Sequence, residues 1–504
     1  MAPFFDNRLR SVIEFVPATV LIGLGGVLMH DPALFFPLLP GLTEVVAAGC
    51  GLLGLVRLWQ GCRIMRYRWQ LRQLPLYVLD ANRIPLSHHK LFLGRGFAWD
   101  QRHSQRLVEA RSPQAKRWLN HNSLYRTARA IELRFEHSRL FGWLTRLTRR
   151  EAWWNPVRPL PPLGGDTALH GVGLEKERDV WMDLSDRVGH TLVLGTTRVG
   201  KTRLAELLVS QDIRRGETVI VFDPKGDVDL LRRMFAESKR AGRLEQFHIF
   251  HLGFPELSER YNPVGEFGRI TEVATRIASQ LPSQGNSAAF REFAWRFTNI
   301  VARALVGLGR KPGYAAIARY VTNIEPLLVD YYHLWLESII PREWRATVQT
   351  IEGNIDDKKL SLALRGRDRH AVALVSFAKE RNLYDPVADG LRSAFEYDKT
   401  YFDKLTASLL PLLEKLTSGK TGELLAPDYA DLQDTRPILD WMRLIRQRGI
   451  IYVGLDALSD SEVAGAVGNS MFADLTSVAG QLYKHGDTLG LPLVARHHRG
   501  RIAI

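Results

Sequence analysis

Gly195–Thr202 reads GTTRVGKT and meets the pattern G-x-x-x-x-G-K-[ST], the feature that most constrains how this chain can fold. The preceding HTLVLG predicts a short buried strand. The following KTRLAELLVSQDI predicts a helix with Leu204, Leu207 and Leu208 on one face. A strand, a loop with glycines and a helix, in that order, form the context in which this pattern binds nucleotide phosphates. We therefore expect a nucleotide site here.

The chemistry of the loop assigns roles to its residues. Its backbone N–H groups curl around the phosphates at a helix N-terminus, where the helix dipole favours negative charge. Lys201 is expected to reach the β- and γ-phosphates as the catalytic cation, and Thr202 to offer its hydroxyl to Mg²⁺. Arg198 is most simply a solvated side chain, with a phosphate contact as the alternative. The expected nucleotide-binding residues are Gly195, Thr196, Thr197, Arg198, Val199, Gly200, Lys201 and Thr202.

A second strand is predicted within ETVIVFDPKGD, at residues 218–222. A strand, a helix and another strand within about 30 residues make a βαβ unit, and hence a parallel sheet. Asp223 then ends a strand at the edge where open α/β sheets bind ligands, and it could help to position Mg²⁺ or water. The alternative, which we favour, is that DPKGD is a turn and that Asp227 caps the next helix.

The rest of the chain predicts an α/β core interrupted by helices. QFHIFHL is a third strand, residues 270–428 show helical patterns throughout, and strand character returns at GIIYVGLD. A second GKT occurs in TSGKTGELL, within the helical part. We reject it as a phosphate loop, because Glu414 stands where the first glycine should be and a helix precedes it.

The N-terminal residues resemble membrane segments. No Lys or Arg occurs between Ser11 and Val56, and two apolar runs there flank a turn with Asp31 and three prolines. Each run approaches the ~20 residues that a spanning helix needs. We expect a two-helix transmembrane hairpin with both ends in the cytoplasm, because arginines flank it on both sides. A cleaved signal peptide is the alternative, but LMHDPA is a poor cleavage site.

The positive charge of the chain is concentrated after the apolar runs. Residues 57–150 contain 20 Lys and Arg against 5 Asp and Glu, a net of +15, whereas the whole chain carries +14. Such a stretch can bind anionic lipid or nucleic acid, or it can simply fix the topology, and charge alone does not decide.

Taken in order, the apolar hairpin, the basic stretch, GTTRVGKT, VFDPKGD, RYNP, the helical insertion and IIYVGLDALSD resemble one family. The chain is similar to type IV coupling proteins of conjugation systems, TraD/TraG-like ATPases, and most of all to the TraD-like proteins of integrative conjugative elements. The resemblance implies an α/β P-loop NTPase core, RecA-like and related to FtsK and HerA, with an all-α insertion domain. It also implies ATP and Mg²⁺ as cofactors and a homohexamer around a DNA channel at the bacterial inner membrane.

The implied function is DNA translocation. Such a protein takes relaxase-bound single-stranded DNA from the relaxosome to the components of a type IV secretion channel. The expected domains are a transmembrane hairpin (1–60), a basic cytoplasmic region (61–165), the first part of the NTPase domain (166–269), an all-helical insertion (270–430) and a second NTPase part (431–504).

The chain departs from the family at its end. LGLPLVA begins a strand where the family has its Walker B strand, which closes in Asp-Glu, but RHHRGRIAI follows instead. We expect a C-terminal truncation or frame shift, with a genuine short variant as the alternative. Asp456 is the only substitute carboxylate in that half of the core. Two other functions therefore stay open: a membrane component that binds nucleotide without hydrolysing it, and a P-loop ATPase that serves protein secretion.

Overall fold

The structure is a computed structural model, and it divides into two compact units, residues 1–208 and 209–504, each described by itself. The residues that it describes are 9, 11–31, 40–73, 77–113, 115, 123–135, 141–152, 155–160, 167–170, 172–173, 177–196, 199–281, 287–341, 343–356, 358, 360–361, 363–397, 402, 409–429, 431, 433–485 and 502–503.

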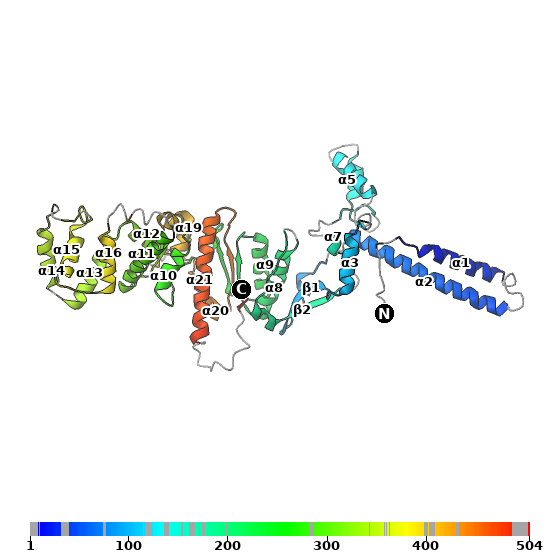
Figure 1. Cartoon of the computed structure of the whole chain (residues 1–504), viewed down its shortest axis with the longest axis horizontal. Helices are drawn as coiled ribbons and strands as arrows, with labels where there is room; N and C mark the ends of the chain where they lie inside the picture. Colours follow the sequence, from blue (N-terminus) through cyan, green and yellow to red (C-terminus); the bar gives the residue numbers. More distant parts are fainter. Residues whose placement is uncertain are drawn as a thin grey trace. The chain divides into compact units, whose positions relative to one another are not determined.

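The first unit is mostly helical, with one small sheet (Figure 1). Its elements are α1 (Phe15–His30), α2 (Pro40–Gln73), β1 (Lys90–Gly96), α3 (Gln101–Arg111), α5 (Ser123–Phe135), α6 (Gly142–Arg149), α7 (Thr167–His170), β2 (Arg178–Asp183) and the start of α8 (Lys201–Arg215).

Helices α1 and α2 pack side by side in antiparallel fashion (Figure 1). Glycines allow the close approach. A Cβ on Gly25 would lie 3.0 Å from the Ala47 carbonyl oxygen, and one on Gly54 would lie 2.6 Å from a side-chain carbon of Ile22. At the base of the pair, Gly61 packs on the ring of Phe15. Small residues at a helix contact are typical of helices that pack in a membrane.

The outer surface of this helix pair is apolar. Val16, Val20, Leu52 and Leu53 each leave more than half of their surface exposed. Among the described residues, one helix is long and apolar enough to cross a bilayer, Gly41–Arg68, with a mean hydropathy of 1.5. The two-span hairpin is therefore not established, because α1 has only 16 residues. Helix α2 also continues to Gln73 without a break at residue 60, where we placed a domain boundary.

The second unit holds a parallel sheet and many helices. Its elements are the second half of α8, β3 (Thr218–Asp223), α9 (Val228–Arg240), β4 (Phe247–His251), α10 (Thr271–Ala278), α11 (Ser287–Gly307), α12 (Tyr314–Thr322), α13 (Glu325–Ile339), α14 (Trp344–Gly353), α15 (Arg369–Glu380), α16 (Pro386–Phe395), α18 (Leu409–Thr417), α19 (Gly419–Leu425), α20 (Trp441–Arg446), β5 (Ile450–Gly454), α21 (Ser461–His485) and β6 (Ile502–Ala503).

The strands lie in the order β4-β5-β3-β6, and every pair is parallel. This confirms the parallel sheet and the three strands expected at β3, β4 and β5. Both faces of the sheet are covered. Val219, Ile450 and Tyr452 pack in a cluster with α8 and α9, whereas their neighbours Ile220 and Ile451 pack in the large helical core. Such two-sided burial explains why consecutive residues of these strands are apolar.

The large core continues into the helical region, from α10 to α19. Within it, the second GKT motif lies at the start of α19, directly after α18, so the predicted helix before it is confirmed. Lys420 of that motif pairs with Glu256. This surface ion pair gives Lys420 a structural partner rather than a phosphate.

Candidate nucleotide site and strand-end cluster

The phosphate loop has the backbone that its glycines predict. Gly200 adopts a φ of +94°, a conformation that side chains with a Cβ rarely take, and it leads into α8 at Lys201. A Cβ on Gly195 would lie 2.6 Å from a methyl group of Val199, so the loop closes tightly on itself. The Lys201 ammonium donates to the carbonyl oxygens of Gly195 at 2.7 Å and Thr196 at 2.6 Å.

The start of α8 offers further donors. The Leu204 N–H donates to the Gly200 carbonyl oxygen at 3.0 Å, and this hydrogen bond ties the start of α8 to the loop. The N–H groups of the first turn before it have no acceptor inside the helix, which makes this end suited to an anion. The exposed side chains of Lys201 and Thr202 stand at the same end. The loop residues Thr197 and Arg198 lie outside the described residues.

The segment before the loop is not a strand, contrary to our prediction from HTLVLG. Residues 191–194 join no sheet, and Leu192 and Leu194 each leave 81% of their surface exposed. A strand is held by hydrogen bonds to its neighbour, and no strand that the structure describes pairs with this segment. The start of the β3 edge pairs instead with β6. An apolar run favours a strand, but a strand forms only where it pairs with a neighbour.

Asp223 ends β3 and is used within the DPKGD turn. One carboxylate oxygen accepts from the Lys225 N–H at 3.0 Å. The other accepts from the Asp227 N–H at 2.7 Å and from the Tyr452 hydroxyl at 2.8 Å. Asp227 in turn caps α9 by accepting from the Asp229 N–H. The turn and capping interpretation is therefore confirmed. Burial, and then Asp223, raise the pKa of Tyr452, so this phenol stays a hydrogen-bond donor.

Asp456 lies at the same edge of the sheet, just after β5. Its φ is +49°, and its carbonyl accepts from the Ser459 N–H at 3.0 Å. The Leu455 N–H donates to the Asp223 carbonyl at 3.0 Å, which joins the two strand ends. The structure thus brings Asp223 and Asp456 to one edge, as the parallel sheet predicts. It does not place their carboxylates in contact.

His251 was not singled out by the sequence, yet it lies at the centre of this edge. It ends β4 and is only 3% exposed. Its Nδ1 accepts from the Gly253 N–H at 2.9 Å, which leaves the ring proton on Nε2. Nε2 is buried without a hydrogen-bond partner. The sequence could have indicated this residue, because a histidine ends one strand and glycines stand at or just after the ends of the others.

Three glycines surround the His251 ring. A Cβ on Gly454 would lie 2.3 Å from His251 Cδ2, and one on Gly226 would lie 2.7 Å from Nε2. Gly253 closes the third side, with a Cβ position 3.1 Å from Cε1. The ring therefore joins the ends of β3, β4 and β5, and a side chain at Gly454 or Gly226 would overlap it.

Gly454→Ala is expected to lower the free energy of unfolding by about 2 kcal/mol or more, because the new methyl group overlaps a ring that is packed on all sides. Chemical unfolding of the purified protein in detergent measures this. His251→Ala in the same chain should recover part of the loss, since it removes the overlapping ring. Equal stability of Gly454→Ala and the unmodified protein would contradict the close packing.

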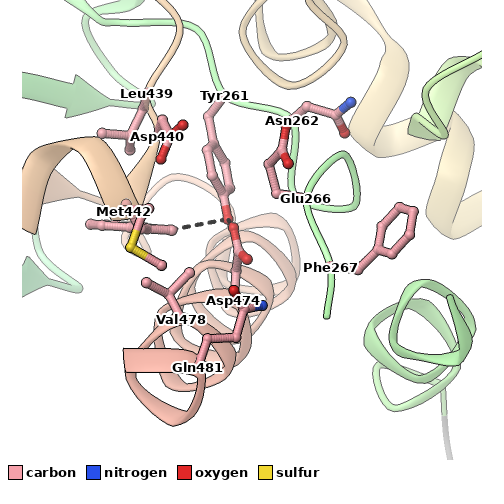
Figure 2. A pocket seen from close by; sticks show the side chains of 11 residues that line it. Tyr261, Asn262, Glu266, Phe267, Leu439, Asp440, Met442, Asp474, Val478 and Gln481 are labelled. Atoms are coloured by element: carbon pink, nitrogen blue, oxygen red, sulfur yellow. Dashed lines mark hydrogen bonds between the residues drawn. The ribbon is translucent and has the colours of Figure 1, made fainter. Parts of the chain in front are cut away.

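A separate pocket of about 270 Å³ lies between the Tyr261 loop, α20 and α21 (Figure 2). Tyr261 donates to Asp474 at 2.7 Å and accepts from the Trp441 indole at 3.3 Å. Asp474 also pairs with Arg276 at 3.1 Å. Burial raises the pKa of Asp474 to about 6, although Arg276 and Tyr261 oppose the shift.

This shift predicts a pH dependence of stability. The folded chain holds the Asp474 proton more tightly than the unfolded chain, whose Asp pKa is about 3.9. The contribution of Asp474 is therefore fully present below pH ~4 and is lost as the pH rises through ~6. Asp474→Asn should gain roughly 3 kcal/mol relative to the unmodified protein between pH 4 and 7. Unfolding curves of both proteins across this range measure the difference, and a constant difference would contradict the raised pKa.

One comparison identifies the first part of the core. Residues 174–258 match the family model described as the central domain of helicase HerA. The segment is similar to HerA-type P-loop ATPases. This HerA-like segment contains the phosphate loop, β3, α9 and β4, and a domain of this type binds nucleotide. No curated protein matches the chain.

Proposed function

We propose that the protein is a membrane-anchored, ATP-driven DNA translocase of the coupling-protein type, TraD-like, in the bacterial inner membrane. It delivers relaxase-bound single-stranded DNA to a type IV secretion channel and works as a homohexamer. One observation carries the proposal: a phosphate loop with the geometry of Gly200 and Lys201 lies inside a HerA-like segment.

The loop fits MgATP by the chemistry of its donors. Lys201 now donates to two loop carbonyls, and phosphate oxygens are stronger acceptors for the same ammonium. Thr202 would offer its hydroxyl to Mg²⁺, which neutralises phosphate charge when it is bound. The chain's own residues thus bind and orient the phosphates at the start of α8.

The anchor is supported by the apolar helix Gly41–Arg68 and by the exposed apolar surface of the α1–α2 pair. Apolar surface of this extent is stable in lipid and promotes aggregation in water. We expect detergent, but not alkaline carbonate, to release the protein from membranes. Release by carbonate alone would contradict the anchor.

ATP turnover by the purified full chain, with and without single-stranded DNA, tests the translocase. We expect turnover that rises when DNA is added. Turnover that is indifferent to DNA would favour an ATPase that serves protein secretion instead.

A second function has its own support. The side chain of Asp223 is used within its turn, and residues 191–194 do not form the strand that usually supports a phosphate loop. Both observations favour a membrane assembly component that binds ATP without hydrolysing it. Saturable ATP binding without turnover, with or without DNA, would select this function.

A further inference from the structure

A polar hollow of about 640 Å³ lies between the start of α10 and the last turns of α21. Its volume is within the roughly 300–1,000 Å³ of ligand sites, but its lining differs from the usual apolar one. Hydroxyl groups and cations dominate it. The hydroxyl residues are Thr271, Thr275, Thr476 and Ser477, and the cations at its rim are Arg269 and Lys484.

The one carboxylate of this hollow is neutralised. Glu272 lies 3.3 Å from Arg276 and accepts from the Ser477 hydroxyl at 2.8 Å. It also accepts from the N–H groups of Gly268 and Arg269. Burial opposes ionisation, but the Ser477 and backbone hydrogen bonds lower the pKa of Glu272 below its usual value. The carboxylate is therefore ionised and fully paired.

Arg276 forms the floor of the hollow, and its charge is neutralised as well. Its side chain is 3% exposed and pairs with both Glu272 and Asp474. By contrast, Arg269 and Lys484 are exposed, and the described part of the chain shows no ion pair for either. Arg269 and Lys484 are thus two cations at the rim with no ion-pair partner among the described residues, and the net charge of the five groups Arg269, Glu272, Arg276, Asp474 and Lys484 is about +1.

An aromatic side chain stands beside the hydroxyls. The Trp295 indole N–H on α11 donates to the Thr275 hydroxyl at 3.0 Å, and Trp295 is partly exposed. The hydrogen bond fixes the edge of the ring next to the hollow. A ring held in this way offers a face on which a base can stack.

We propose that this hollow binds single-stranded DNA, with Arg269 and Lys484 on the phosphates and Trp295 against a base. The inference rests on the proposed translocase function and places part of its DNA contact. Arg and Lys side chains commonly contact nucleic-acid phosphates. Single strands are bound by a positive groove combined with aromatic stacking. The hollow between α10 and α21 supplies both.

The experiment measures the binding of a fluorescent single-stranded oligonucleotide to the full chain in detergent, over a series of salt concentrations. Arg269→Ala/Lys484→Ala is expected to lower the affinity severalfold. It should also lower the slope of log affinity against log salt by about 1.4, at about 0.7 for each lost phosphate contact. Trp295→Ala is expected to lower the affinity without changing the slope, because stacking releases no counterions.

A matched control removes the same charge elsewhere in the unit. Arg232→Ala/Lys239→Ala changes exposed cations on α9 for which, as for Arg269 and Lys484, the described residues show no ion pair. We expect its affinity and slope to equal those of the unmodified protein. If the unmodified protein binds DNA and the hollow variants do so equally well, the inference is wrong and the proposed function stands. If the unmodified protein binds no DNA, the proposed function fails and the inference fails with it.

Discussion

Lys201→Ala is expected to lower ATP turnover by about 100-fold or more, because we propose Lys201 as the cation at the phosphates. Removal of one electrostatic donor from a catalytic site typically costs roughly 10²–10³ in rate, on the order of 3–4 kcal/mol. Binding of a fluorescent ATP analogue should weaken in parallel. The side chain is exposed, and its hydrogen bonds to described residues go to loop carbonyls, so the midpoint of thermal unfolding should stay unchanged. Turnover and nucleotide binding by the purified variant measure the effect.

The chain provides its own control for this substitution. Lys420 stands in the second GKT, at the start of α19, and pairs with Glu256 at the surface. Lys420→Ala removes a lysine from the second GKT motif, yet it should leave nucleotide binding unchanged. An exposed ion pair contributes only about 0–1 kcal/mol to stability. Equal losses of turnover in both variants would mean that the loop at Lys201 is not the nucleotide site.

Arg276→Leu is expected to lower the free energy of unfolding by about 3–5 kcal/mol, because it leaves buried carboxylate charge without its partner. The guanidinium pairs with Asp474 and Glu272 and donates to the carbonyl oxygens of Pro263 and Glu266. Chemical unfolding at pH 7 measures the loss.

The double variant Arg276→Leu/Asp474→Leu separates charge from packing. Removal of both partners leaves no unpaired charge at Asp474, so the double variant should be more stable than Arg276→Leu alone. A double variant that is less stable than the sum of the two single losses would show that packing, rather than charge, dominates at this place.

Local patterns predicted the strands and their caps. The runs at β3, β4 and β5 are short, rich in apolar residues and bounded by turns, and two-sided burial of the sheet explains their apolar content. Asp227 was predicted as a helix cap from its place before VDLLRR, and its side chain makes that bond. Signals of this kind lie within a few residues of the element that they describe.

Long-range partners could not be predicted in this way. The apolar residues 191–194 favour a strand, but no pattern within them reports whether a neighbouring edge is free. The hydrogen bond from Tyr261 to Asp474 joins residues 213 apart, and the His251 ring meets glycines from three separate strand ends. These contacts exist only after the sheet has assembled.

The pairing between β3 and β6 has a consequence for the behaviour of the protein in solution. Strand β3 runs from Thr218 to Asp223. Within the described residues, β6 pairs with Thr218 and Val219 alone. In the part of the chain that the structure describes, no strand pairs with β3 beyond Val219 on that side, and unpaired backbone groups of this kind can accept a strand from another molecule. Concentrated preparations are therefore expected to self-associate by strand addition, and a short peptide that mimics a parallel neighbour of β3 should compete with this association.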